Sequence, residues 1–172
     1  MLLGCHASNL GSQGSWSTYH NQRYNFEFPY PKNWVSVPMP DNGDGGAFRD
    51  PQNSSVEIRG WAANKLPEIA ASPTSIKLSE GQPRLKKKAP ALAVTAKDAP
   101  KSQQQNFTTE QGLTGKLKVK IGSQISSMTL TLNQGKVEYN WQGQCDSKQF
   151  ADYYRFFYYV ASQYRISSAE KP

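Results

Sequence analysis

Hydrophobic and polar side chains alternate in several short stretches of this 172-residue sequence. The first stretch, residues 24–30, places Tyr24, Phe26 and Phe28 on one side of an extended chain. This period of two predicts a strand that buries one face. Shorter strands of the same kind are predicted near residues 34–37, 47–49 and 56–61.

The alternation returns in the second half of the chain, in three consecutive stretches. These stretches cover residues 116–121, 128–132 and 137–141, and each alternates apolar with Lys, Thr or other polar side chains. Residues 133–135, Asn-Gln-Gly, are typical of a tight turn between two strands. We therefore expect a three-stranded antiparallel meander with one apolar face.

Apolar residues near the C-terminus recur at the three- and four-residue spacing of a helix, with the last turn near residues 165–166. Asp146 or Ser147 is expected to cap this helix, with Gln149 reaching back from a capping box. The predicted buried stripe consists of Phe150, Tyr153, Phe157, Val160, Ala161 and Tyr164, widened by Tyr154, Phe156, Tyr158 and Tyr159. The predicted fold class is α+β: an antiparallel sheet of about seven short strands packed with a C-terminal helix.

The middle of the chain, residues 64–105, has a different composition. It contains five prolines and no aromatic residue, which predicts a mostly irregular insertion with at most a short helix around residues 89–96. Residues 84–120 hold nine basic and two acidic residues, so this segment accounts for the net charge of +7.

A concentrated block of positive charge favours an acidic partner, although a solvated segment that only promotes solubility has the same composition. The candidate contacts to an anionic partner are Lys86, Lys87, Lys88, Lys116, Lys118 and Lys120. We expect no nucleic acid among the partners, because no aromatic residues alternate with these lysines to stack on bases.

The N-terminal sequence Leu-Leu-Gly-Cys, which ends at Cys5, resembles the lipobox of bacterial lipoproteins. This resemblance implies a lipid anchor on Cys5, and the alternative is an ordinary thiol. Residues 6–17 are rich in Ser, Gly, Asn and Gln, the composition of a flexible tether. The predicted organisation is therefore a lipid-anchor region and tether over 1–20, a single domain over 21–166 and a tail over 167–172.

Catalytic chemistry has little support in the sequence. Two His and two Cys are scattered along the chain, whereas structural zinc needs about four closely spaced ligands. No nucleophile elbow, Walker A loop or dinucleotide fingerprint occurs. We expect no catalytic residue, no metal and no cofactor; an enzyme would have to use His20 or Cys145.

Three segments resemble the PsbP-like superfamily, which includes the extrinsic P-protein of photosystem II, its cyanobacterial lipoprotein relatives and the DcrB-like bacterial lipoproteins. Residues 24–34, Tyr-Asn-Phe-Glu-Phe-Pro-Tyr-Pro-Lys-Asn-Trp, are similar to its opening strand and corner. Residues 48–51, Phe-Arg-Asp-Pro, fit the next strand, and residues 150–166 are similar to the closing helix. The resemblance covers residues 19–61 and 111–166, and it implies a PsbP-like α/β/α sandwich.

The resemblance also implies accessory, assembly or scaffold roles rather than catalysis. The leading hypothesis is a membrane-tethered accessory protein outside the cytoplasm, periplasmic or thylakoid-lumenal, whose partner is a protein complex at the membrane. The alternative is a module that binds polyanions or anionic lipid surfaces through residues 84–120. A hydrolase-type enzyme is the third hypothesis.

Overall fold

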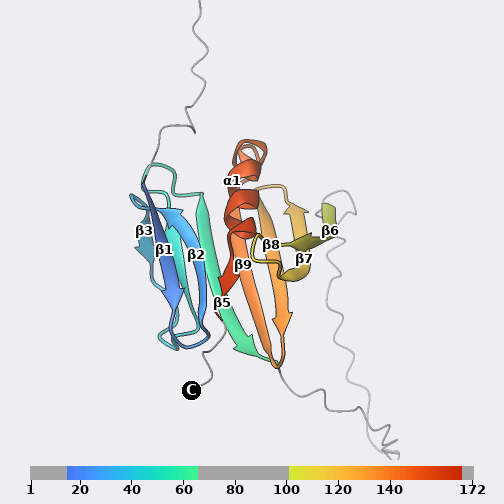
Figure 1. Cartoon of the computed structure of the whole chain (residues 1–172). Helices are drawn as coiled ribbons and strands as arrows, with labels where there is room; N and C mark the ends of the chain where they lie inside the picture. Colours follow the sequence, from blue (N-terminus) through green and yellow to red (C-terminus); the bar gives the residue numbers. More distant parts are fainter. Residues whose placement is uncertain (1–14, 66–100, 168–172) are drawn as a thin grey trace, which may run out of the picture.

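The computed structural model describes residues 15–65 and 101–167, which form two antiparallel sheets and one helix (Figure 1). The seven-stranded sheet has the spatial order β3 (Val35–Val37), β4 (Gly45–Arg49), β5 (Glu57–Asn64), β9 (Val137–Asp146), β8 (Ile125–Gln134), β7 (Thr114–Ile121) and β6 (Lys101–Thr108). The three-stranded sheet has the order β1 (Trp16–Asn21), β2 (Phe26–Pro31) and β10 (Arg165–Ile166). Helix α1 spans Phe150–Ser162.

The core lies on one side of the seven-stranded sheet, which we call the core face. Helix α1 packs against β8 and β9 on this side, and the small sheet packs beside it over β4 and β5 (Figure 1). Alternate residues of the long strands are fully buried here, as strand geometry requires when one face is covered. They include Ile58, Leu117, Met128, Leu130 and Trp141. The predicted meander is confirmed as β7, β8 and β9.

Two glycines let the covering layers approach the backbone of the large sheet. A Cβ atom on Gly60 would collide with the ring of Phe28 in β2, and one on Gly143 with the ring of Phe157 in α1. Each aromatic ring therefore occupies the space that a side chain on the sheet would fill. These contacts fix where the small sheet and the helix can lie.

The predicted helix boundaries are wrong at both ends. The N-cap is Gln149, whose side chain makes no capping bond, because its Oε1 accepts a hydrogen bond from Asn53 Nδ2 at 2.9 Å. Asp146 Oδ1 instead accepts the backbone N–H of Lys148 at 2.9 Å. The helix ends at Ser162, and after Gln163 and Tyr164 the chain forms β10, in which Ile166 pairs with β2 and is buried.

Ten strands occur in the described residues where about seven were expected, because β1, β6 and β10 have no clear hydrophobic alternation. Residues 16–20 of the expected tether belong to β1, which pairs with β2 along its full length. Residues 101–105 of the expected irregular insertion belong to β6, a polar strand at the sheet edge that buries one hydrophobic side chain, Phe107. The remaining insertion, with its expected short helix, lies outside the described residues.

The fold class is confirmed as α+β, with antiparallel sheets and a C-terminal helix. The parts of the chain that the structure describes contain one helical layer, α1; the second layer of an α/β/α sandwich is not among them.

Candidate functional site

The side of the seven-stranded sheet that faces away from α1 is called the open face. Strand register determines which side chains meet there, because residues that pair across strands point to the same side. Lys118 of β7 pairs with Thr129 of β8, which pairs with Gln142 of β9. Gln142 in turn pairs with Arg59 of β5. A continuous row of polar side chains thus crosses four strands.

Three exposed lysines lie in a line along β7 on the open face: Lys116, Lys118 and Lys120. Alternate residues of a strand are about 6.8 Å apart, so the three charges span about 14 Å. Uncharged polar residues flank them on both sides, namely Ser102, Gln104 and Asn106 of β6 and Ser127, Thr129 and Thr131 of β8. We call this set of nine residues the lysine strip.

The charge of the lysine strip is not neutralised by nearby carboxylates in the described part of the chain. Strands β6, β7 and β8 contain no Asp or Glu, and none of the salt bridges within residues 15–65 and 101–167 involves these lysines. Lys116 Nζ donates a hydrogen bond to Asn106 Oδ1 at 2.6 Å. The strip therefore presents positive charge and hydrogen-bonding groups to solvent.

A second charged cluster on the open face is internally paired. Glu57 has a side chain only 5% exposed, and it lies between two arginines. Arg49 Nη2 donates to Glu57 Oε2 at 2.7 Å, and Arg59 Nη2 donates to Glu57 Oε1. Burial alone would raise the pKa of Glu57, but hydrogen bonds from Arg49 and Arg59 and their positive charges hold it below its ordinary value. One carboxylate is thus shared by two guanidinium groups, which leaves a net positive charge.

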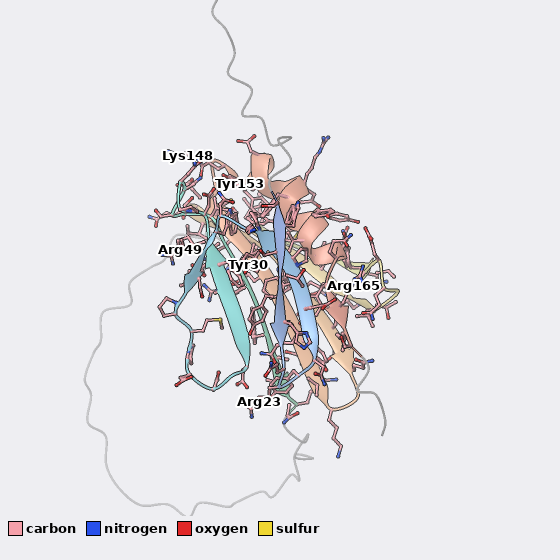
Figure 2. The ribbon with its side chains drawn as sticks, turned by 60° about the vertical axis from the view of Figure 1, so that its left-hand side comes forward. Arg23, Tyr30, Arg49, Lys148, Tyr153 and Arg165 are labelled. Carbon is pink, nitrogen blue, oxygen red and sulfur yellow. The ribbon has the colours of Figure 1, made fainter. Side chains whose placement is uncertain are left out.

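This cluster lies toward one end of the sheet. Arg49 lies nearer to Lys148, which precedes α1, than to Arg23 at the far end of the molecule (Figure 2). Glu57 pairs with Gln144, which pairs with Ser127, which pairs with Lys120. The arginine pair and the lysine strip therefore belong to one surface, joined by uncharged amide and hydroxyl groups.

Two open hollows lie beside the row of residues that contains Asn140. One, of about 340 Å³, is lined by Trp61, Arg59 and neighbours that include Met39 and Pro40. The other, of about 380 Å³, is lined by Lys116, Asn106, Thr131 and neighbouring residues of β6, β7 and β8. Asn140 pairs with both Trp61 and Thr131 and so lies between them. This broad, shallow surface suits a large polar partner better than an enclosed small molecule.

The two candidate catalytic side chains are not brought together. Cys145 is fully buried in β9, and burial, with smaller contributions from Asp146 and Asp152, raises its pKa to about 11. The thiol is therefore protonated near neutral pH and is a poor nucleophile. His20 lies on β1 of the small sheet, where its Nδ1 is 3.9 Å from Glu27 Oε2.

Residues 15–65 and 101–167 contain neither a metal-binding cluster nor a helix that could span a membrane. No three His, Cys, Asp or Glu side chains gather there in a way that could hold a metal ion. The single helix in this part of the chain is too short and too polar to cross a bilayer.

The outer side of α1 forms a second unusual surface. Tyr154, Tyr158 and Tyr159 were expected to widen the buried stripe, but they are 37%, 42% and 45% exposed. The helix contacts the core mainly through Phe150, Phe157, Val160 and Ala161. The tyrosines stay partly exposed, although Tyr154 contacts Phe150 and Tyr158 contacts Phe107 of β6 edge-on, with ring centroids 5.2 Å apart in the second pair. Trp16 of β1, 44% exposed, contacts Tyr159 with a ring-centroid distance of 5.3 Å.

The structure places some of the residues that the sequence proposed as contacts to an anionic partner, and it does not test their role. Of the candidate lysines, Lys116, Lys118 and Lys120 share one exposed face, whereas Lys86, Lys87, Lys88 and Cys5 lie outside the described residues. Arg49 and Arg59 were missed as site residues. The alternation of Glu57 and Arg59 with buried residues was visible, but their position on the lysine surface depends on the order of strands.

Comparisons with known proteins report on the fold. No family model matches the sequence, and no curated protein does. The structure of cyanobacterial PsbP (CyanoP) from Synechocystis sp. PCC 6803 superposes with a TM-score of 0.59, at 12% identity, over 96% of this chain and 99% of that one. A protein from Bacteroides thetaiotaomicron VPI-5482 gives a TM-score of 0.45 at 12% identity, over 93% of this chain and 51% of that one. The chain has a PsbP-like fold, as the sequence predicted.

Proposed function

We propose that this chain is a non-catalytic accessory protein, held through Cys5 at the extracytoplasmic side of a membrane, that binds an acidic partner protein through the open face. The observation that carries the proposal is the lysine strip: three exposed cations in line, without a carboxylate on β6, β7 or β8. A positive surface of this kind attracts an acidic surface and accelerates encounter with it.

The rest of the open face supports a protein partner. The amide of Gln142 and the hydroxyl of Thr129, both partly exposed, lie between the lysines and arginines, and such groups form the direct hydrogen bonds of polar interfaces. Trp61, partly buried at the margin, adds a residue type that is enriched in binding hot spots. Binding to an anionic lipid surface would require only a patch of cations and none of these hydrogen-bonding groups.

Binding of the chain to membranes from the source cells, measured at several salt concentrations, tests whether the partner is an acidic membrane protein. The full chain is mixed with native membranes, with protease-treated membranes and with vesicles of the extracted lipids. We expect binding to native membranes that weakens as salt rises, a strong reduction in K116Q/K118Q/K120Q, and little binding to the other two preparations. The matched control K32Q/K136Q/K148Q removes the same charge from exposed positions elsewhere.

Equal binding to native and protease-treated membranes would contradict a protein partner and favour the anionic-lipid alternative. Equal loss in both triple variants would show that net charge alone determines binding.

The anchor is tested separately by the intact mass and N-terminal peptide of protein purified from its own membranes. A diacylglyceryl mass on Cys5 is expected, and an unmodified Cys5 in the soluble fraction would contradict the tether.

A further inference from the structure

The exposed rings of Trp16, Tyr154, Tyr158 and Tyr159 form a continuous surface, which we call the aromatic face. Tyr154 stacks on Tyr158 with a centroid distance of 6.4 Å, and Trp16 contacts Tyr159. An open hollow of about 340 Å³ lies among Tyr154, Arg155, Tyr158, Tyr159 and Ser162. Four large exposed aromatic residues in one place need an explanation, because exposed aromatic groups of this kind mark interaction sites.

The side chains of the aromatic face suit the boundary between lipid and water. Trp and Tyr combine an apolar ring with a polar tip, and both are enriched at membrane interfaces. Arg155 is exposed and lines the same hollow as the three tyrosines. Its long side chain can reach lipid phosphates with the guanidinium while its apolar stem stays beside the rings. Surface helices that lie flat in the headgroup region carry such aromatic and basic residues.

The position of the first described strand suggests which surface would meet this face. Strand β1 begins at Trp16, itself a member of the aromatic face. Cys5 precedes Trp16 by eleven residues, and a chain of that length reaches at most about 40 Å when fully extended. An acyl group on Cys5 would therefore hold the Trp16 end of the domain close to the bilayer.

We propose that the aromatic face docks on the headgroup region of the bilayer that holds the lipidated Cys5; this rests on the anchor in the proposed function. The anchor and the face then act together, because a tethered domain meets the membrane at high effective concentration. Helix α1 covers the core face of the large sheet. Docking through its outer side consequently turns the open face, with the lysine strip, away from the membrane and toward a partner.

The test supplies the anchor chemically. The full chain is coupled through Cys5 to a maleimide lipid in phosphatidylcholine vesicles that contain a nitroxide-labelled lipid, while Cys145 is fully buried and escapes the reagent. The signal of Trp16 is obtained as the fluorescence difference between the chain and its W16F variant. We expect shallow nitroxide to quench this signal by about twofold, because Trp prefers the interface.

Two variants make the test specific. Y154Q/Y158Q/Y159Q keeps good helix formers at the exposed positions and is expected to lose the quenching, whereas K116Q/K118Q/K120Q is expected to keep it. If the triple tyrosine variant fails to fold, Y158E serves instead, since it places one carboxylate in the same face. Quenching that persists in a folded tyrosine variant would overturn the proposal.

Absence of Trp16 quenching in the anchored, folded chain would also overturn the proposal that the aromatic face docks on the bilayer. Tyrosine cross-links between copies that rise with surface density, without nitroxide quenching, would show that a second copy covers the aromatic face. Because the anchor is added chemically, either result concerns docking alone. Acylation of the native Cys5 is decided independently by the mass measurement, and partner binding by the native-membrane assay.

Discussion

The open face and the aromatic face lie on opposite sides of one core, and they are supported in different ways. Each polar side chain of the open face is placed by the hydrogen-bonded ladder of its own strand, so neighbours can change without moving it. The aromatic face depends mainly on one helix of 13 residues, which contacts the sheet through a few buried side chains, with Trp16 of β1 beside it. Substitutions at buried positions should therefore affect the second face far more than the first.

The largest expected effect is at Phe157, the fully buried residue of α1 that packs over Gly143. Replacement by Ala leaves a cavity under the helix, and we expect F157A to lower the free energy of unfolding by about 3–5 kcal/mol. Urea unfolding monitored by circular dichroism measures this. The control Y159A, on the aromatic face, should cost about 1 kcal/mol or less, because the ring of Tyr159 contacts the exposed Trp16 rather than a buried ring. Equal losses would contradict the assignment of the buried side of α1.

The next effect is at Glu57, the carboxylate that joins two arginines on the open face. The E57Q variant keeps the shape but removes the charge, leaving Arg49 and Arg59 close together without compensation. Since both arginines are partly exposed, we expect a loss of about 1–3 kcal/mol in unfolding free energy. E138Q is the matched control, because Glu138 accepts a single side-chain hydrogen bond, from Asn140.

The same carboxylate gives a pH dependence with a defined sign. The pKa of Glu57 is lower in the folded protein than its ordinary value of 4.5. Its stabilising contribution is therefore complete above about pH 4.5 and is lost as pH falls through the lowered pKa. Unfolding free energies measured between pH 7 and pH 3 should fall more steeply for the parent chain than for E57Q. Parallel curves would contradict this assignment.

A smaller effect on stability is expected for the lysine strip. Because Lys116, Lys118 and Lys120 are exposed, K116Q/K118Q/K120Q should change the free energy of unfolding by no more than about 0.5 kcal/mol per site. The same variant should weaken binding to native membranes strongly, as proposed above. A large loss of stability would instead mean that the lysines have a structural role.

The smallest effect is expected at Cys145. With a pKa of about 11 and no solvent exposure, the thiol of a C5S variant should not react with maleimide at pH 7 until the protein unfolds. Mass spectrometry before and after denaturation measures this. Rapid labelling of the native C5S protein would show that β9 opens, and the vesicle experiment would then need a C145S background.

The sequence predicted those strands whose own side chains show one buried face, such as β7, β8 and β9. It missed β6, where Ser, Gln and Asn give no alternation because the strand is at the sheet edge. It also missed β10, two residues that become a strand only by pairing with β2.

The layout of the candidate site could be predicted only in part, for a related reason. Local alternation placed the three lysines of β7 on one face, but only the strand order β5-β9-β8-β7 brings Arg59 into the same row as Lys118. The tyrosines of α1 were wrongly assigned to the core because many aromatic residues made the helix look apolar nearly all round. Burial of so broad a stripe would need covering layers on both sides of the helix.

Strand β10 has a consequence for how the protein matures. Arg165 pairs with Glu27, and the N–H of Ser167 donates to the carbonyl of Asn25 at 2.7 Å, so residues about 140 positions apart close the small sheet. Contacts so distant in sequence form late, because a long loop must close first. A nascent chain still held in a ribosome or a translocation channel lacks this partner for β2. The small sheet is therefore complete only once residues 165–167 are free to pair with β2.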